Sequence, residues 1–269
     1  MNTFFLDRLN SEPHALAFAG QSTPWPVALA DQSANPALDE ALHTHAAAAQ
    51  ALLYPVSAEL LATTGRPVDL FGFEPNPARL GAAAAASASV PGIALTQLGA
   101  LLDAAALGYN PAQAKPVAVL GHSQGVLAVH MVQAICEAGS IDAAAAKIDE
   151  ILAIATLIGV AGTRQARQLG LAARHGEATP MLSVKDITRA QVDALIERVD
   201  GARGPIAVAV TNSATHYVLS GYPEDLAAFG VEVAKEHKRQ AKLREEKVRG
   251  GRVFNPVLEY LDVTLPFHS

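Results

Sequence analysis

The chain has 269 residues, with 20 basic and 26 acidic side chains, a net charge of −6 and a single cysteine. That cysteine, Cys136, excludes an intramolecular disulfide, and no Cys/His pattern indicates a zinc site. The negative net charge argues against a general nucleic-acid binder. Alanine accounts for 54 residues and aromatic side chains for 14. We therefore expect a folded protein whose core is built from small and aliphatic side chains.

Membrane insertion and secretion are not expected from the sequence. No run of 18 residues is apolar without charged or turn residues, so no transmembrane helix is predicted. At the N-terminus, Asp7 and Arg8 lie inside what would be the apolar region of a signal peptide. The expected location is cytoplasmic.

The first part of the chain predicts helices around one strand. A short helix over residues 1–13 leads into a strand over Ala15–Ala19, and leucines at helical spacing predict a helix over 36–63. Residues 65–92 are rich in Pro, Gly and Ala and predict an irregular connection. A helix over 92–107 follows, with its leucines and isoleucine on or near one face.

A strand–turn–helix pattern comes next. Residues 115–120 form a short apolar run bounded by Pro and Gly, which is typical of a buried parallel strand. Glycine-rich residues 121–125 predict a turn, and 126–138 a helix that Gly139 ends. A second long helix over about 142–169 is apolar on most sides and is expected deep in the structure.

From residue 178 the pattern changes to short strands alternating with helices. Thr188 and Gln191 form a possible capping box, and Pro223 opens a second helix. The expected strands are Met181–Val184, 206–210, His216–Ser220 and Asp262–Pro266. The order β-α-β-β-α-β fits a ferredoxin-like unit.

The predicted fold class is thus α/β, a hydrolase-like parallel-sheet core with an inserted ferredoxin-like subdomain. The core covers residues 1–177 and the subdomain 178–265, and residues 266–269 are expected to return toward the core.

The sequence Gly121-His122-Ser123-Gln124-Gly125 is a G-x-S-x-G motif in a strand–turn–helix context. A nucleophilic serine needs this geometry, because the sharp turn exposes its hydroxyl and glycines tolerate the close backbone approach on either side. The following helix directs its N-terminal amides at developing negative charge. We interpret Ser123 as a nucleophile; a purely structural turn is the alternative.

A serine nucleophile needs a base, and the chain offers nine histidines. Most of them lie in polar or helical surface contexts. His268 differs because it follows an apolar segment at the end of the second subdomain, from which a base could face the nucleophile across a cleft. The spacing alone leaves open that His268 is an ordinary residue near the chain end.

Four motifs occur in a characteristic order: Ala19-Gly20-Gln21, the GHSQG turn, Asn212-Ser213 through Ser220-Gly221, and Phe267-His268-Ser269. Together they resemble the acyl-carrier-protein acyltransferase family, the malonyl/acetyl transferases of fatty acid synthases. The GHSQG form and the stretch from Lys247 to Phe254 are most similar to the acetyltransferase domain of bacterial and fungal type I synthases.

The resemblance implies a role for each matching residue. Ser123 would be the acylated nucleophile and His268 its general base, while the backbone N–H groups of Gln124 and Gln21 would form the oxyanion hole. The implied reaction is ping-pong transfer from acetyl-CoA to the phosphopantetheine thiol of an acyl carrier protein. No permanently bound cofactor or metal is implied, and the implied partners are the carrier protein and other domains of the multienzyme.

The identity of the acyl group depends on the long helix predicted over about 142–169, the second helix after the nucleophile. In malonyl-selective relatives an arginine there pairs with the free carboxylate of the substrate, and Ile158 occupies the matching position. No Lys or Arg occurs from Ile148 to Thr163. Burying a carboxylate without a partner costs several kcal/mol. We therefore expect acetyl or another short uncharged acyl group; Ile158 as ordinary core is the alternative.

Other functions remain open on the sequence. They are a malonyl or palmitoyl transferase of the same fold, an α/β-hydrolase acting as an esterase or thioesterase, and a scaffold without chemistry. An α/β-hydrolase would need further parallel strands after residue 125 and an acidic residue before a late histidine. Because the family's chains continue beyond the catalytic histidine, the resemblance also predicts that these residues are part of a longer synthase polypeptide.

Overall fold

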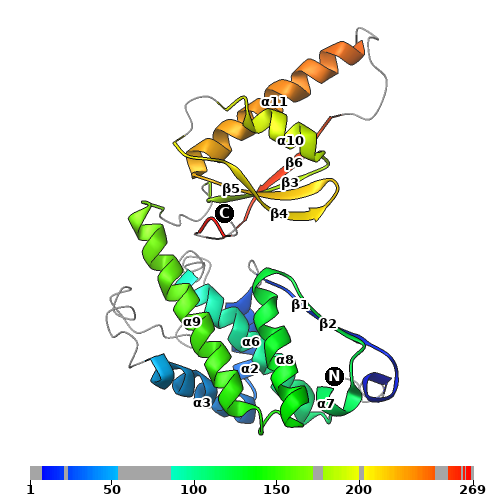
Figure 1. Cartoon of the computed structure of the whole chain (residues 1–269), viewed down its shortest axis with the longest axis vertical. Coiled ribbons are helices and arrows are strands. Elements are labelled where there is room, and N and C mark those ends of the chain that lie inside the picture. The colour runs from blue at the N-terminus through cyan, green and yellow to red at the C-terminus, as the bar shows by residue number, and fades with distance from the viewer. Residues whose placement is uncertain are drawn as a thin grey trace. The chain divides into compact units, whose positions relative to one another are not determined.

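The computed structural model describes residues 8–20, 24–53, 86–171, 178–199, 203–245, 254–261, 263 and 265–267. Contacts divide the chain into two units, Met1–Arg164 and Gln165–Ser269 (Figure 1). The boundary between the units lies inside a long helix, whereas the sequence pattern changes at residue 178.

Unit 1 contains a two-stranded parallel sheet. Strand β1 (Ala15–Phe18) pairs with β2 (Ala118–Gly121), with Ala15 opposite Ala118 and Phe18 opposite Gly121. This confirms the predicted parallel pairing. The expected burial of the second strand is wrong, because Leu120 is 59% exposed. Among the described residues the sheet has only these two strands, so no further described strand covers the free side of β2.

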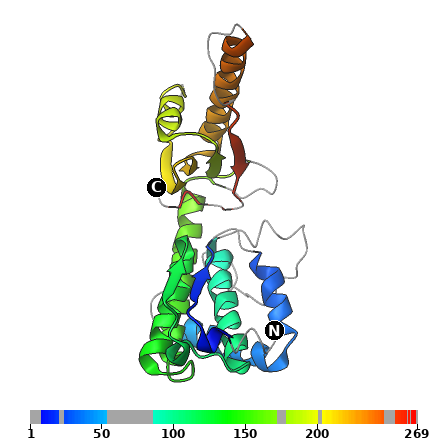
Figure 2. The ribbon, with the colours of Figure 1, turned by 90° about the vertical axis from the view of Figure 1, so that its right-hand side faces the viewer.

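The helices of unit 1 pack on one another, and α8 packs on the two-stranded sheet (Figure 2). They are α2 (Trp25–Ser33), α3 (Pro36–Leu53), α6 (Ala86–Ala106), α7 (Pro111–Ala114), α8 (Val126–Ala138) and the part of α9 (Ala145–Gln168) up to Arg164. Gly139, in the left-handed region at φ 88°, ends α8 as predicted. Helix α2 is an element that the sequence pattern did not predict.

Helix α6 is the central helix of unit 1 and contacts α2, α3 and α8. Its segment Ser87–Ala106 is long and apolar enough to cross a membrane by length and composition, but it is largely buried inside the unit, as in a core helix. The sequence predicts a start at residue 92, whereas α6 begins at Ala86 and continues through Pro91. A Cβ at Gly92 would lie 2.5 Å from the Trp25 ring, so close packing on α2 stabilises this segment.

Unit 2 is a four-stranded antiparallel sheet with two helices on one face (Figure 1). In chain order its elements are β3 (Met181–Lys185), α10 (Arg189–Ile196), β4 (Ala207–Ser213), β5 (His216–Ser220), α11 (Pro223–Glu245) and β6 (Val257–Tyr260). The sheet order is β4-β5-β3-β6, and every neighbouring pair is antiparallel. This confirms the predicted ferredoxin-like order.

The position of the last strand differs from the prediction. The sequence predicts Asp262–Pro266, whereas β6 ends at Tyr260 and pairs with β3, with Tyr260 opposite Leu182. Beyond β6, the amide of Val263 bonds to the carbonyl of Leu261 at 2.8 Å, which turns the chain out of the strand. Val263 packs on the sheet face opposite the helices. Asp262 and Thr264 lie outside the described residues.

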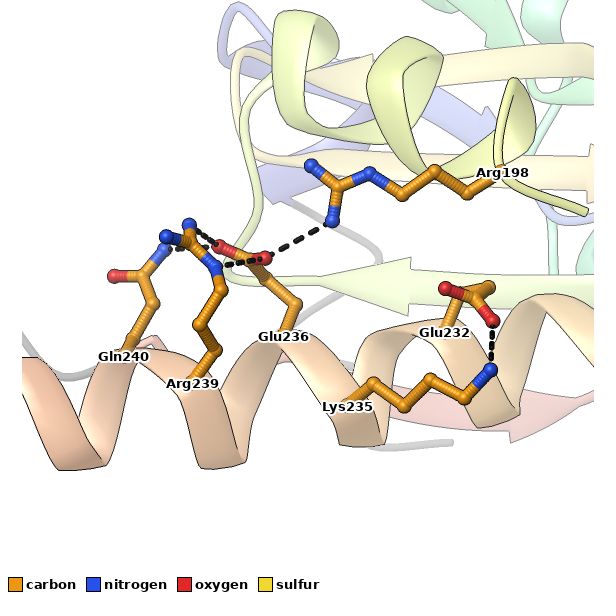
Figure 3. Close-up of polar contacts among 6 residues, drawn as sticks. All are labelled: Arg198, Glu232, Lys235, Glu236, Arg239 and Gln240. Atoms are coloured by element: carbon orange, nitrogen blue, oxygen red, sulfur yellow. Dashed lines mark hydrogen bonds and ion pairs between the residues drawn. The ribbon is translucent and has the colours of Figure 1, made fainter.

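The two helices of unit 2 are anchored by polar contacts. Thr188 and Gln191 form the predicted capping box of α10. The buried carboxylate of Glu236 on α11 accepts hydrogen bonds from Arg239 and Gln240 of the same helix and from Arg198, which follows α10 (Figure 3). The Arg198–Glu236 pair therefore connects the end of α10 to the middle of α11.

Candidate active site

Ser123 lies in a tight turn between β2 and α8. Residues Ser123–Gly125 form one turn of 3-10 helix, and Ser123 has a φ of 52°. A serine in this left-handed region is strained, and such strain persists only where the surrounding structure holds it. The strand–turn–helix context predicted for the G-x-S-x-G motif is therefore present.

Two glycines of the motif are required by close backbone contacts. A Cβ at Gly121 would lie 2.5 Å from the carbonyl carbon of Gly125. A Cβ at Gly125 would clash with the backbone carbonyl of Phe18 in β1. The amide of His122 also donates to the Phe18 carbonyl at 3.0 Å. The turn is thus pressed against the end of the neighbouring strand.

Gly20 brings the segment after β1 next to the nucleophile turn. A Cβ at this position would lie 3.0 Å from the Ser123 Cβ and 3.3 Å from the amide nitrogen of Gln124. The structure therefore brings Gly20 of the first motif next to the GHSQG turn. The two motifs meet at the backbone N–H of Gln124, which was expected to contribute to the oxyanion hole. Gln21, the second expected donor, directly follows Gly20 but lies outside the described residues.

Helix α6 supplies two anchors that sequence reasoning missed. The side-chain amide of buried Gln97 donates to the carbonyl of Ala19 at 2.7 Å. The side-chain amide of Gln124 donates to the carbonyl of Val90, also on α6. The available signal was a glutamine on a largely apolar helix, because a buried polar side chain is normally hydrogen-bonded.

The expected base cannot be placed against Ser123. His268 lies outside the described residues, and its role stays a prediction. Of the other histidines, His122 and His130 are exposed in unit 1. In unit 2 the Nε2 atom of His216 lies 3.0 Å from the hydroxyl of Ser183.

Helix α9 has one buried and one exposed face. Its buried side chains include Ile148, Ile151 and Leu152, whereas Ile154 and Ile158 are 51% and 45% exposed within the described chain. Helix α9 is apolar on both faces, as predicted, but only one face is buried within the described residues, so the expectation that the helix lies deep in the structure holds for that face alone. Ile158 is on the helix surface, which makes it available for a contact outside the core of unit 1.

Among the described residues, no group of three or more His, Cys, Asp or Glu side chains is arranged to hold a metal ion.

Comparisons with known proteins agree with the motifs. The family described as fatty acid synthase central AT domain matches residues 180–260. The fatty acid synthase beta subunit hexB of Dothistroma septosporum is 27% identical over 169 residues, which are 56% of this chain and 8% of that protein. The fatty acid synthase subunit beta of Schizosaccharomyces pombe is 26% identical over 205 residues, which are 68% of this chain and 9% of the relative. The chain thus spans under a tenth of the length of these relatives.

The fold also has counterparts among solved structures. The malonyl CoA-acyl carrier protein transacylase from Coxiella burnetii superposes with a TM-score of 0.52 and 17% identity, over 95% of this chain and 63% of that chain. At this identity the comparison supports the fold alone.

Proposed function

We propose that this chain, which is related to the acyl-carrier-protein acyltransferases of fatty acid synthase, transfers an acyl group from coenzyme A to the phosphopantetheine thiol of an acyl carrier protein. The single observation that carries the proposal is the strained turn that holds Ser123 between β2 and α8, beside Gly20. The fungal relatives named above are fatty acid synthase subunits, which supports a carrier protein as acceptor and a multienzyme as context.

In the first half-reaction the Ser123 hydroxyl attacks the thioester carbonyl carbon. The hydroxyl proton passes to a base, for which His268 is our candidate, and the tetrahedral oxyanion accepts hydrogen bonds from the backbone amides of Gln124 and Gln21. Collapse breaks the C–S bond, and the coenzyme A thiolate takes the proton from the base. The acyl group is then held as an ester on Ser123.

In the second half-reaction the carrier thiol replaces coenzyme A. It gives its proton to the same base and attacks the ester carbon through a second oxyanion. The C–O bond breaks and Ser123 recovers its proton. Loss of one oxyanion-hole donor typically costs on the order of 10²–10³ in rate.

We further propose that the acyl group is acetyl or another short uncharged group. Helix α9, the second helix after the nucleophile, has no Lys or Arg from Ile148 to Thr163, so a malonyl carboxylate finds no cationic partner on that stretch. Without a partner, a desolvated carboxylate costs several kcal/mol.

The test is covalent labelling of the 269-residue chain with radioactive acetyl-CoA. We expect one label per chain on Ser123, no label in Ser123→Ala, and full label in Ser140→Ala, the same change at another turn of unit 1. Absence of label on Ser123 in the folded chain would contradict the proposal.

The same labelled protein separates a transferase from an esterase. An esterase releases acetate to water, whereas a transferase keeps the ester until a thiol arrives. We expect the label to persist in buffer and to leave on addition of pantetheine. Rapid hydrolysis without thiol would favour the esterase instead, although the described residues lack the further parallel strands that an α/β-hydrolase requires.

A further inference from the structure

The side chain of Gln124 connects the nucleophile turn to helix α6. Gln124 follows Ser123 in the GHSQG turn, and its backbone N–H is one of the two expected oxyanion-hole donors. Its side-chain amide donates a hydrogen bond to the carbonyl of Val90, which lies 34 residues earlier in the chain. Both residues belong to the compact unit 1. The proposed reaction uses only the backbone of Gln124 and assigns no role to its side chain.

The acceptor of this bond is held firmly within unit 1. Val90 is 2% exposed and its neighbour Ser89 is 4% exposed, and α6 contacts α2, α3 and α8. Two residues further on, α6 packs so closely on α2 that a Cβ at Gly92 would lie 2.5 Å from the Trp25 ring. Because close-packed interiors have low compressibility, the Val90 carbonyl is a fixed point on which the turn can be positioned.

The nucleophile turn needs such a fixed point because its backbone is strained. Ser123 has a φ of 52° and lies in a single turn of 3-10 helix. Backbone in this region persists only where its surroundings hold it. From β1, the Phe18 carbonyl holds the turn by accepting from the His122 amide at 3.0 Å and by the close approach of Gly125. The Gln124 side chain adds a second support, from α6.

The segment that follows β1 is attached to the same helix. Gln97 of α6 donates to the carbonyl of Ala19 at 2.7 Å. Gln97 lies about two helical turns after Val90, which places both on the same side of α6. Helix α6 therefore holds the two segments from which an oxyanion hole is expected, the GHSQG turn and the Ala19-Gly20-Gln21 motif.

An oxyanion-hole donor acts only within a narrow range of positions. The N–H nitrogen must lie about 2.7–3.1 Å from the oxygen that becomes charged in the transition state, and a site displaced by about 1 Å loses activity. If the Gln124 side chain were released from Val90, the strained turn would be free to relax and the N–H that follows Ser123 would change direction. Because the oxyanion does not exist in the bound substrate, this would slow the chemical step without weakening the binding of acetyl-CoA.

We propose that the side chain of Gln124 is a positioning residue, whose hydrogen bond to Val90 holds the backbone N–H of Gln124 in the oxyanion hole. The proposal rests on the proposed acyl transfer at Ser123. Both half-reactions pass through an oxyanion on the same acyl carbon. Loss of the side-chain bond therefore slows the acylation of Ser123 and the transfer of acetyl to a thiol by a similar factor.

The test compares the unmodified 269-residue chain with Gln124→Met, which has a side chain of similar length without the donor. We expect acylation by labelled acetyl-CoA and deacylation by pantetheine each to be about tenfold slower, a part of the 10²–10³ that loss of a whole donor costs. KM for acetyl-CoA should change less than twofold. Gln124→Asn, whose amide is one methylene short of Val90, should behave alike. Gln133→Met, the same change on the exposed face of α8, should leave both rates unchanged.

The final extent of labelling separates positioning from folding. A displaced donor slows labelling but still allows one label per chain, whereas misfolding leaves part of the chains unlabelled. The proposal is overturned if Gln124→Met is labelled as fast as the unmodified chain, if only one half-reaction slows, or if the slower rate is matched by an equal loss of final label.

The backbone amide signal of Gly125 in the nitrogen-15 NMR spectrum gives a readout that does not require acylation. We expect it to be sharp in the unmodified chain and in Gln133→Met, and broadened by exchange in Gln124→Met. An unlabelled Ser123 in the unmodified chain would contradict the proposed function. An unchanged Gly125 signal in Gln124→Met would instead contradict the positioning role alone.

Discussion

Gly20 packs directly against Ser123, with room for a hydrogen atom but not for a methyl group between them. A Cβ at residue 20 would lie 3.0 Å from the Ser123 Cβ and 2.7 Å from the carbonyl oxygen of His122. Residues about a hundred positions apart in the chain are therefore in contact at the nucleophile turn. The strained backbone of Ser123 depends on the segment that follows β1 as well as on its own glycines.

Gly20→Ala should lower the rate of Ser123 acylation at least tenfold. The new methyl group would displace the His122 carbonyl, which is backbone and cannot move without shifting the turn. The rate of acylation by labelled acetyl-CoA measures the effect. The control is Gly230→Ala in α11, where the nearest heavy atom, Leu258 Cδ1, is 3.7 Å away. This variant should acylate normally and gain up to about 1 kcal/mol of stability, and equal rates for both variants would contradict the prediction.

Gln97→Leu should reduce acylation about tenfold with a stability loss of about 1 kcal/mol or less. The variant removes the donor to Ala19, so the position of Gly20 is less well defined. The stability loss is small because the buried Oε1 of Gln97, which has no partner among the described residues, disappears with the donor.

The kinetic readout separates positioning from folding in this variant. We expect kcat for transfer to fall while KM for acetyl-CoA changes less than twofold. Gln133→Leu removes a glutamine from the exposed face of α8 and should leave kcat unchanged. A fall in kcat matched by an equal loss of folded protein would show that Gln97 has only a structural role.

Ile158→Arg should raise the ratio of malonyl to acetyl transfer about tenfold. The side chain is already half exposed on α9, so arginine should change stability by about 0.5 kcal/mol or less. Its guanidinium would offer the bidentate partner that a malonyl carboxylate requires. Initial rates with both coenzyme A esters measure the ratio.

Ile154→Arg is the matched control, one helical turn earlier and equally exposed. It places the same charge on α9 at a position that the family resemblance does not assign to selectivity. If both variants raise the ratio equally, the effect is a general attraction of anions. If Ile158→Arg still transfers acetyl but its ratio is unchanged, the assigned position is wrong.

The fold of unit 2 was largely predictable because its signals are local. The capping residues Thr188 and Gln191 and the opening Pro223 each act within one helical turn. The last strand was misplaced because residues 257–260 and 262–266 both combine aliphatic side chains with polar or charged ones. Only pairing with β3, a long-range contact, selects Val257–Tyr260.

The strand–turn–helix context of Ser123 was predictable from the sequence, whereas the contacts that support the turn were not. The glycines around Ser123 are visible in the motif, although only the contact of Gly121 with Gly125 is local, and Gly125 is required by the distant Phe18 carbonyl. The contacts of Gln97 with Ala19 and of Gln124 with Val90 join segments far apart in sequence, so no spacing rule could reveal them. The start of α6 in unit 1 was mispredicted for the same reason. The helix continues through Pro91, where it packs against α2, and this contact between distant segments is not visible in the local sequence.

Glu236 should make the stability of unit 2 depend on acid. Hydrogen bonding from Arg239, helped by Gln240 and Arg198, lowers the pKa of this carboxyl group from 4.5 to about 2. Because the charged form is favoured in the folded state, the contribution is complete above about pH 4.5 and is lost as the pH falls through about 2. Such a shift corresponds to at most about 3 kcal/mol, and the half-exposed arginine partners reduce it to about 1–2 kcal/mol.

Urea unfolding of Glu236→Gln and of the unmodified chain, followed by circular dichroism, measures this contribution. The difference in unfolding free energy should be about 1–2 kcal/mol at pH 7 and should shrink toward zero near pH 2. Glu232→Gln is the control on the same helix, because Glu232 pairs only with the exposed Lys235 among the described residues (Figure 3), and it should cost less than about 1 kcal/mol. A difference in unfolding free energy that does not change with pH would contradict the prediction. It would mean that Glu236 connects α10 to α11 through hydrogen bonds, which the neutral amide of glutamine replaces incompletely, and that its charge does not stabilise unit 2.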